Sequence, residues 1–246
     1  MGQKLAAYNT SGAITAFYDT VDSPAPAGVT TIDITDTQWQ TCLSNSGYTV
    51  VSGVLTPPSP PTPAQLAATA QAIQVSTLQV AYNAAVQANV SYTSKGNITE
   101  TYQANPQSVQ NLQNTILGFQ AAGVVPTGFY WVAADNTQVP FTYADLQGLA
   151  TVMVNAGWAN FQTLQTKKAQ VVALVNLPPR AASTPYTTGV QIVDTNGNVW
   201  GCTTAGTTGT TCTFPATPAV GATKTDGGVT WMFAGSQVAL IQGVVF

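Results

Sequence analysis

A short proline-rich segment divides this chain and constrains its fold more than any other feature. Residues 56–63 read Thr-Pro-Pro-Ser-Pro-Pro-Thr-Pro, with five prolines in eight positions. Proline lacks an amide hydrogen and has a fixed φ angle, so such a run stays extended and cannot enter a packed core. The sequence therefore predicts a linker over residues 57–63, with separate folded parts on either side. A proline motif that is bound by an aromatic groove of another protein is the alternative interpretation.

Charged side chains are scarce in this sequence. They make up 6% of its residues, against roughly 25% in typical globular proteins, and none occurs from Thr37 to Ser94. A surface of hydroxyl and amide groups can be buried against another protein without removing water from ions, a step that costs several kcal/mol per ion. We therefore expect a chain that functions in contact with other chains. A stable monomer with a neutral polar surface is the alternative.

The same composition argues against nucleic-acid and membrane partners. The six Lys and Arg residues are scattered, and only Lys167 and Lys168 are adjacent, whereas nucleic-acid binding needs a basic face. No apolar run approaches the roughly 18 residues that a membrane-spanning helix requires. The first residues show no basic-then-apolar signal segment, and Ala6 stands where an N-myristoylation motif needs Ser or Thr. We therefore expect neither nucleic-acid binding nor membrane insertion.

Two residue types that many enzymes and metal sites depend on, histidine and glutamate, are nearly missing. The chain has no histidine and a single glutamate, Glu100, which removes the commonest general base and the usual nucleophilic triads. Residues 194–196 begin like a calcium loop, but the glutamate that such a loop needs further on is absent. We predict a non-enzymatic protein with no catalytic, cofactor-binding or metal-binding residues.

Three cysteines, Cys42, Cys202 and Cys212, form an odd set without metal-ligand spacing. Such usage favours a protein made in the cytoplasm, where thiols stay reduced. Whether Cys202 and Cys212 pair with each other stays open at this level.

Residues 1–56 predict a small α+β domain. Two apolar runs flank Thr10-Ser11-Gly12, which suits a hairpin. A strand is expected over residues 31–34, and Thr35 with Gln38 three residues on forms a capping box that starts a helix. Residues 48–55 are expected to return as a strand.

A long helix is predicted over residues 64–91. Thr62 suits the N-cap and Pro63 the first helical position, and neither Gly nor Pro follows until after Val90. Leu66, Ile73 and Val80 repeat at seven residues, the spacing that forms a narrow seam along one side of a helix. We expect this row to be either a seam between identical chains or an intramolecular packing surface.

Residues 92–177 predict a helix, a short β-hairpin and a second helix. The first helix begins at Asn105-Pro106, the hairpin turns at residues 135–137, and Thr142 with Asp145 caps the second helix. Phe161 is among the apolar residues assigned to that second helix. Gly157 predicts a kink or break there. Pro178-Pro179 then opens a second linker over residues 178–185.

Residues 186–246 shift to Gly, Thr and Val and predict an all-β module, with a last strand over residues 238–246. Tyr186, Trp200 and Trp231 either form the core of this module or stack on a glycan. The whole chain is therefore expected to be an α+β, multi-domain protein.

The central part resembles an uncharacterised helix-hairpin-helix domain family of tailed-bacteriophage tail and tail-fibre proteins. The residues that carry this resemblance lie between about Tyr92 and Leu174 and are Gly96-Asn97-Ile98, Tyr102-Gln103-Ala104-Asn105, Ser108-Val109, Leu112, Trp131, Asp135-Asn136-Thr137, Phe141-Thr142, Asp145-Leu146 and Leu149. Residues 1–56 are similar to the N-terminal part of phage tail-fibre assembly proteins. Residues 186–246 look like small β modules appended to phage tail and fibre proteins.

These resemblances imply a structural protein of the virion tail that is made in the cytoplasm of the host bacterium. We expect a short tail fibre or a fibre-attachment component that works as a homo-oligomer, most simply a homotrimer, alongside other phage tail proteins. A tail-fibre assembly chaperone, a host-surface glycan-binding module and a capsid decoration protein are the alternatives.

Overall fold

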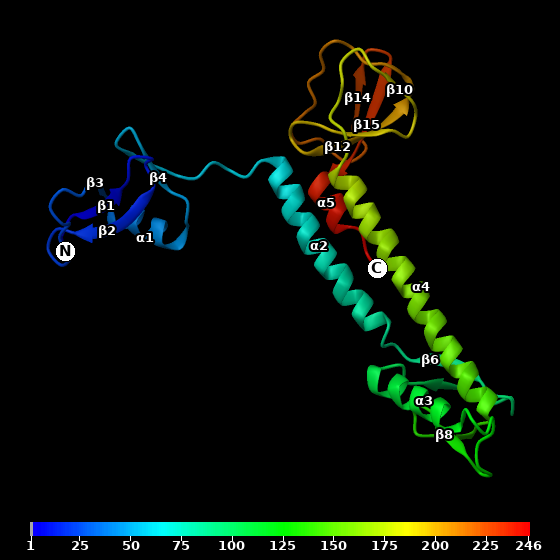
Figure 1. The fold of residues 1–246 in the computed structure, drawn as a ribbon. Helices are drawn as coiled ribbons and strands as arrows, with labels where there is room; N and C mark the ends of the chain where they lie inside the picture. Colours follow the sequence, from blue (N-terminus) through cyan, green and yellow to red (C-terminus); the bar gives the residue numbers. More distant parts are fainter. Residues whose placement is uncertain (1) are drawn as a thin grey trace. The chain divides into compact units, whose positions relative to one another are not determined.

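The structure is a computed structural model that describes residues 2–246, and it contains both α-helices and β-strands (Figure 1). The chain divides into two compact units, residues 1–61 and residues 62–246. The boundary falls inside the predicted linker over residues 57–63, where the run of prolines keeps the backbone extended. The mixed α and β character expected from the sequence is confirmed.

The N-terminal unit is a three-stranded antiparallel sheet with one helix. Strand β1 (Lys4–Tyr8) lies between β2 (Ile14–Asp19) and β3 (Thr31–Ile34), and α1 (Asp36–Ser44) follows. The predicted capping box is present, because the Thr35 side chain accepts from the Gln38 amide while the Gln38 side chain accepts from the Thr35 amide.

Residues 48–55 do not form the single strand that we expected. The chain forms a tight hairpin of β4 (Thr49–Val51) and β5 (Val54–Thr56). Ser52 and Gly53 both have positive φ, at 50° and 78°. Two successive left-handed residues are what a two-residue hairpin turn requires, so the strand reverses there.

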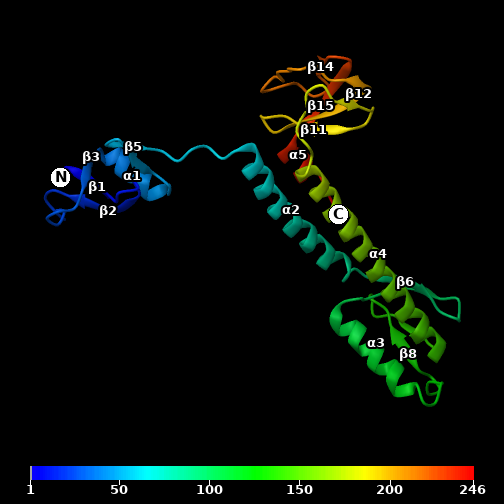
Figure 2. The same ribbon diagram turned by 45° about the horizontal axis from the view of Figure 1, so that its top comes forward.

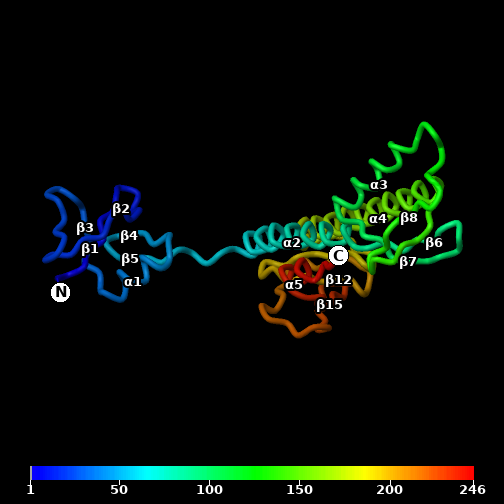
Figure 3. The backbone as a smooth tube through the Cα atoms, turned by 90° about the horizontal axis from the view of Figure 1, so that it is seen from below, coloured from blue at the N-terminus to red at the C-terminus, as the bar shows by residue number. Residues whose placement is uncertain are grey.

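Three helices pack together at the centre of the second unit. They are α2 (Pro63–Ala85), α4 (Tyr143–Val175) and the short α5 (Gln237–Gln242), and Figures 2 and 3 show α2 beside α4 and α5 beside α2. Their shared core contains buried Ala67, Leu78, Leu164, Val171 and Ile241. The side chain of Gln237 donates to the carbonyl of Leu174 at 2.6 Å, so it satisfies a carbonyl at the C-terminal end of α4.

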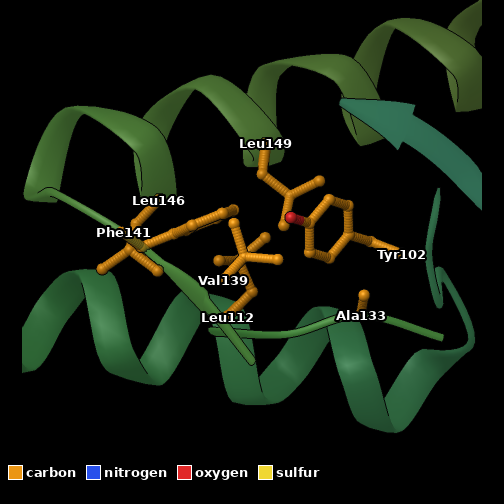
Figure 4. Close-up of a cluster of buried hydrophobic side chains, with 7 residues drawn as sticks. All are labelled: Tyr102, Leu112, Ala133, Val139, Phe141, Leu146 and Leu149. Atoms are coloured by element: carbon orange, nitrogen blue, oxygen red, sulfur yellow. The ribbon is translucent and has the colours of Figure 1, made fainter. Parts of the chain in front are cut away.

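A second core forms where α4 begins. Hairpin β6 (Val90–Thr93) and β7 (Thr99–Tyr102), helix α3 (Pro106–Phe119), and hairpin β8 (Tyr130–Val132) and β9 (Gln138–Pro140) gather around it. Figure 4 shows its seven buried side chains between α3 and α4. The Tyr102 hydroxyl is buried there without a hydrogen-bond partner, and burial raises its pKa to about 12.

The C-terminal module contains a four-stranded sheet in the order β11-β12-β15-β14 and a two-stranded sheet of β10 and β13. The strands are β10 (Pro185–Tyr186), β11 (Gln191–Val193), β12 (Asn198–Thr204), β13 (Gly206–Thr207), β14 (Thr223–Asp226) and β15 (Val229–Ser236). The module lies directly against α2, because a Cβ added at Gly197 would stand 2.9 Å from the Pro63 Cβ.

The module is not all β, and residues 238–246 are not a strand. Ser236 caps α5 by accepting from the Ala239 amide, and the helix turns its apolar Ile241 into the three-helix core. The apolar run that suggested a buried strand therefore belongs to a buried helix, which periodicity alone does not distinguish.

Two further predictions about the helices need correction. The helix predicted over residues 64–91 ends at Ala85, because Val90 already pairs with Tyr102 in a hairpin. Helix α4 runs unbroken through Gly157. The packing of α4 along α2 and α3 outweighs the roughly 1 kcal/mol that a glycine costs in a helix.

Residues 178–185 are bound to the C-terminal module instead of forming a free linker. The Val193 amide donates to the Pro178 carbonyl at 3.0 Å, and the Thr184 amide donates to Thr208 Oγ1 at 2.9 Å. Because these backbone groups have partners in the module, the segment is held against it.

Candidate functional site

Helix α2 has one buried face and one exposed apolar row. Its buried residues are Ala67, Ala70, Gln74 and Leu78. The predicted row points elsewhere, since Leu66 is 46% exposed, Ile73 55% and Val80 66%. Residues seven apart lie nearly above one another on a helix, about 10 Å apart along its axis, so these three lie in one line, here called the α2 row. Intramolecular packing therefore uses a different face of α2.

A shallow hollow runs along one side of the α2 row. Its volume is about 450 Å³, and it is lined by residues of α2, α5 and the β11–β12 turn, among them Leu66, Ile73 and Val238. None of the residues that line it is charged. The α2 row and this hollow together present an apolar surface that a neighbouring side chain can enter without displacing water from an ion.

A second apolar group lies on the outside of α4. Val154 is 69% exposed, Trp158 58% and Phe161 39%, and the rings of Trp158 and Phe161 stack at 5.6 Å between centroids. Sequence reasoning overlooked Trp158 and assigned Phe161 to the apolar stripe of this helix. Val154, Trp158 and Phe161 are spaced by four and three residues, which places them on one face of α4. This spacing could have revealed that α4 carries apolar residues on two faces.

The two tryptophans proposed as glycan-facing residues are core residues. Trp200 and Trp231 are both fully buried, and Tyr186 packs edge-on against Trp231 with ring centroids 5.0 Å apart. The indole N–H of Trp200 donates to Asp194, and that of Trp231 donates to Asp226. The glycan interpretation is therefore wrong for Trp200 and Trp231, which the module itself buries, and for the half-buried Tyr186 it stays a prediction.

Asp194 has the role of a turn residue. Its carboxylate accepts from the backbone amides of Asn196 at 2.8 Å and Asn198 at 2.9 Å, as well as from Trp200. Such bonds close an Asx turn. Within residues 2–246, no cluster of three or more His, Cys, Asp or Glu side chains is placed to hold a metal ion.

A buried ion pair connects the segment after α4 to the C-terminal module. Arg180 donates from Nε to Asp226 Oδ2 at 2.6 Å and from an Nη atom to Asp226 Oδ1 at 2.8 Å. The Asp226 side chain is fully buried and also accepts from the Gly209 amide. The bonds from Arg180 outweigh burial and hold the pKa of the Asp226 carboxyl below its usual range.

Asp145 has a comparable role at the start of α4. It accepts from the amide and hydroxyl of Thr142, from the Lys95 amide at 2.7 Å and from the Tyr92 hydroxyl at 3.2 Å. Burial alone would raise the pKa of this carboxyl, but the hydrogen bonds lower it. A carboxylate whose oxygens already accept four hydrogen bonds is stabilised in its charged form and is a weak base.

In the N-terminal unit, Lys4 contacts Asp19 at 2.5 Å and lies over the Trp39 ring, 4.6 Å from its centroid. The hydrogen bond raises the pKa of Lys4 and lowers that of Asp19. The three cysteines are free thiols in the structure, and burial raises the pKa of each. The two contacts of Lys4 connect strand β1 to the end of β2 and to α1.

Part of this chain is similar to one known protein family. Residues 69–187 match the family described as "Domain of unknown function (DUF4376)". The match begins within α2 and ends just after β10, and it covers just under half of the chain. No curated protein and no solved structure matches the chain. No helix within residues 2–246 is both long and apolar enough to cross a membrane.

Proposed function

We propose that this chain is a non-enzymatic structural protein of a phage tail, specifically a short tail fibre or fibre-attachment component that acts as a homo-oligomer. The observation that carries this proposal is the α2 row, in which Leu66, Ile73 and Val80 stay exposed on a helix without a single charged residue. Exposed apolar side chains that line up on one side of a helix, next to an uncharged hollow, indicate an interaction site. The sequence resemblance to phage tail proteins supplies the setting.

The spacing of the row favours association of identical helices. A repeat of seven residues keeps one side of a helix facing its partner along the whole contact, as in a coiled coil. Identical chains satisfy this requirement at once, because each contributes the same row around a symmetry axis. The uncharged flanks allow close approach, since no like charges face each other across such an axis.

Burial of the α2 row offsets part of the cost of association. Complete burial of a Leu, Ile or Val side chain contributes about 1.5–3 kcal/mol, and the three residues are already about half covered, so each adds on the order of 1 kcal/mol. Association costs about 4–15 kcal/mol. In a trimer the three rows together contribute on the order of 9 kcal/mol against two association steps, so the hollow beside each row must be buried as well. We propose a homotrimer on one symmetry axis, with the exposed Trp158 and Phe161 available to other tail proteins.

The first test is the mass of the particle in solution, measured by light scattering after size-exclusion chromatography. The full chain is expected at about three times its monomer mass. Ile73→Gln keeps a good helix former but replaces an apolar group that is 55% exposed, and it should shift the protein towards monomer. Val220→Gln is the matched control, because Val220 is 82% exposed outside the helices and should leave the mass unchanged.

The second test is the location of the protein in phage particles. Detection in purified virions at a defined copy number per tail supports the structural role. An assembly chaperone would instead bind the growing fibre and be absent from mature virions, so absence there overturns the structural proposal.

A further inference from the structure

A groove beside the β8–β9 hairpin has the features of a ligand site and lies apart from the α2 row. Its volume is about 360 Å³, within the range of about 300–1,000 Å³ that small-molecule sites occupy. It is lined by Gln103 and Asn111, by Tyr130 and Trp131 of β8, and by Asn136 at the hairpin turn.

Strand β8 presents an unpaired backbone edge to this groove. The Phe141 amide donates to the Phe129 carbonyl and the Ala133 amide donates to the Thr137 carbonyl. In an antiparallel pair these bonds occur at alternate residues, so the peptide groups of Tyr130 and Val132 point away from β9. Pro140, which has no N–H to donate, stands opposite Tyr130 and agrees with this register. Peptide donors and acceptors are therefore directed towards the groove.

The polar side chains of the groove are neutral, and some of their hydrogen-bond donors have no partner within the protein. Asn111 Oδ1 accepts from Gln107 at 2.8 Å and Gln103 Oε1 accepts from Ser108 at 3.3 Å, which leaves the N–H groups of both amides free to donate. None of the residues lining the groove is charged. Asp135 is close in sequence, but its carboxylate accepts from the amide and hydroxyl of Thr137. A charged ligand would find no opposite charge here.

One aromatic ring is exposed beside the open edge of the strand. Trp131 is half-buried and packs against the core between α3 and α4. Neighbouring residues of a strand point to opposite faces, so Tyr130, which is 46% exposed, points away from that core. A sugar ring has an apolar C–H face that packs on an aromatic ring, and a rim of hydroxyls that both donate and accept hydrogen bonds.

We propose that this groove binds a neutral oligosaccharide. The Tyr130 ring packs against the sugar, the exposed part of Trp131 lines the groove beside it, and the amides of Gln103 and Asn111 hydrogen-bond to the sugar hydroxyls together with the β8 backbone. An extended peptide pairing with the β8 edge is the competing ligand. Strand β8 is only three residues long, and only two of its residues, Tyr130 and Val132, direct their N–H and C=O groups outward. This is a short edge for pairing with a peptide strand. The mixed neutral donors and acceptors fit hydroxyl groups better.

The test uses the full chain with three defined probes: maltoheptaose, cellohexaose and the tetramer of N-acetylglucosamine. Binding is followed through backbone amide NMR signals and by titration calorimetry. We expect saturable binding of at least one probe, with the largest signal shifts at residues 129–133. Tyr130→Ala should weaken that binding by about tenfold or more, and Asn111→Ala by about three- to tenfold.

Asn114→Ala is a closely matched control. Asn114 also lies on α3 and its side chain also accepts from a glutamine four residues earlier at 2.8 Å, but it does not line the groove. The Asn114→Ala variant should bind the sugar with the same affinity as the unsubstituted chain. Circular dichroism checks that each variant is folded. The groove contains no residue of the α2 row. A failure of sugar binding would therefore leave the trimer proposal intact, and a failure of the trimer proposal would leave the sugar site intact.

Three results would overturn the proposal. One is the lack of saturable binding for every probe up to about 10 mM. Another is equal binding by the Asn111→Ala and Asn114→Ala variants. The third is a shift of the Tyr130 and Val132 amide signals by an uncharged extended hexapeptide that the sugars fail to produce, which would identify the edge as a peptide-pairing site.

Discussion

Two glycines inside α4 have opposite environments, and this leads to opposite expectations for the same substitution. A Cβ added at Gly148 would overlap the Tyr92 ring and its hydroxyl, whereas a Cβ added at Gly157 meets nothing within 4 Å. The Tyr92 hydroxyl in turn donates to the buried Asp145. Gly148 is therefore needed so that β6 can pack closely against α4.

Gly148→Ala should destabilise the protein by about 1–3 kcal/mol, because the inserted methyl forces Tyr92 from its position. Gly157→Ala should stabilise it by about 0.5–1 kcal/mol, because alanine restricts the unfolded chain and favours helix. Urea unfolding followed by far-UV circular dichroism measures both changes. Equal effects at the two positions would show that the contact with Tyr92 has no energetic weight.

At the scale of elements, the starts of helices and the tight turns were predictable from sequence. Thr35, Thr62, Asn105 and Thr142 all occupy the N-cap positions expected of them. Caps of this kind depend on residues within three positions of one another, so the information is local. The hairpin at residues 135–137 is predictable for the same reason.

Features that depend on distant partners were not predictable. Residues 238–246 carry an apolar run that fits strand or buried helix, and only the core between α2 and α4 selects the helix. The spacing of Leu66, Ile73 and Val80 predicted the α2 row, but not that α4 and α5 would cover a different face. The neutral groove combines residues of α3 with an outward strand edge, and no local pattern brings these together.

The ion pair between Arg180 and Asp226 joins two elements and predicts a pH dependence. The folded-state pKa of Asp226 is lowered, so the unfolded state binds more protons in acid, and stability is lost as pH falls through the unfolded pKa of about 3.9 and below. Asp226→Asn leaves Arg180 without its carboxylate and should cost about 3–5 kcal/mol at pH 7.

Hydrogen exchange of β14 and β15 between pH 7 and pH 3 measures this effect, after correction for the intrinsic pH dependence of exchange. The unsubstituted protein should lose protection in these strands on acidification, and the Asp226→Asn variant should lose less. Asp33→Asn is the control, because Asp33 is exposed in the N-terminal unit and its loss should not alter β14. A pH dependence that persists unchanged in Asp226→Asn would contradict the assignment.

At the scale of the whole molecule, the part that resembles a known family is not a complete folding unit. The matched residues 69–187 omit α5, yet the core shared by α2 and α4 includes Ile241, with Val244 and Phe246 packed against it. Gln74 on α2 donates to the Val244 carbonyl at 2.6 Å. The C-terminal residues therefore complete the core between α2 and α4, although they lie outside the matched segment.

A fragment of residues 62–246 should therefore fold with the same melting temperature as that unit in the full chain, because the core clusters of the unit contain no residue before Ala67. A fragment of residues 62–187 leaves Leu78, Leu164 and Val171 uncovered. The loss of a buried apolar side chain costs about 2–5 kcal/mol, so this fragment should melt well below the longer one and tend to aggregate. Differential scanning calorimetry of the two fragments decides the question. Equal melting temperatures would show that α2 and α4 form a stable pair without α5.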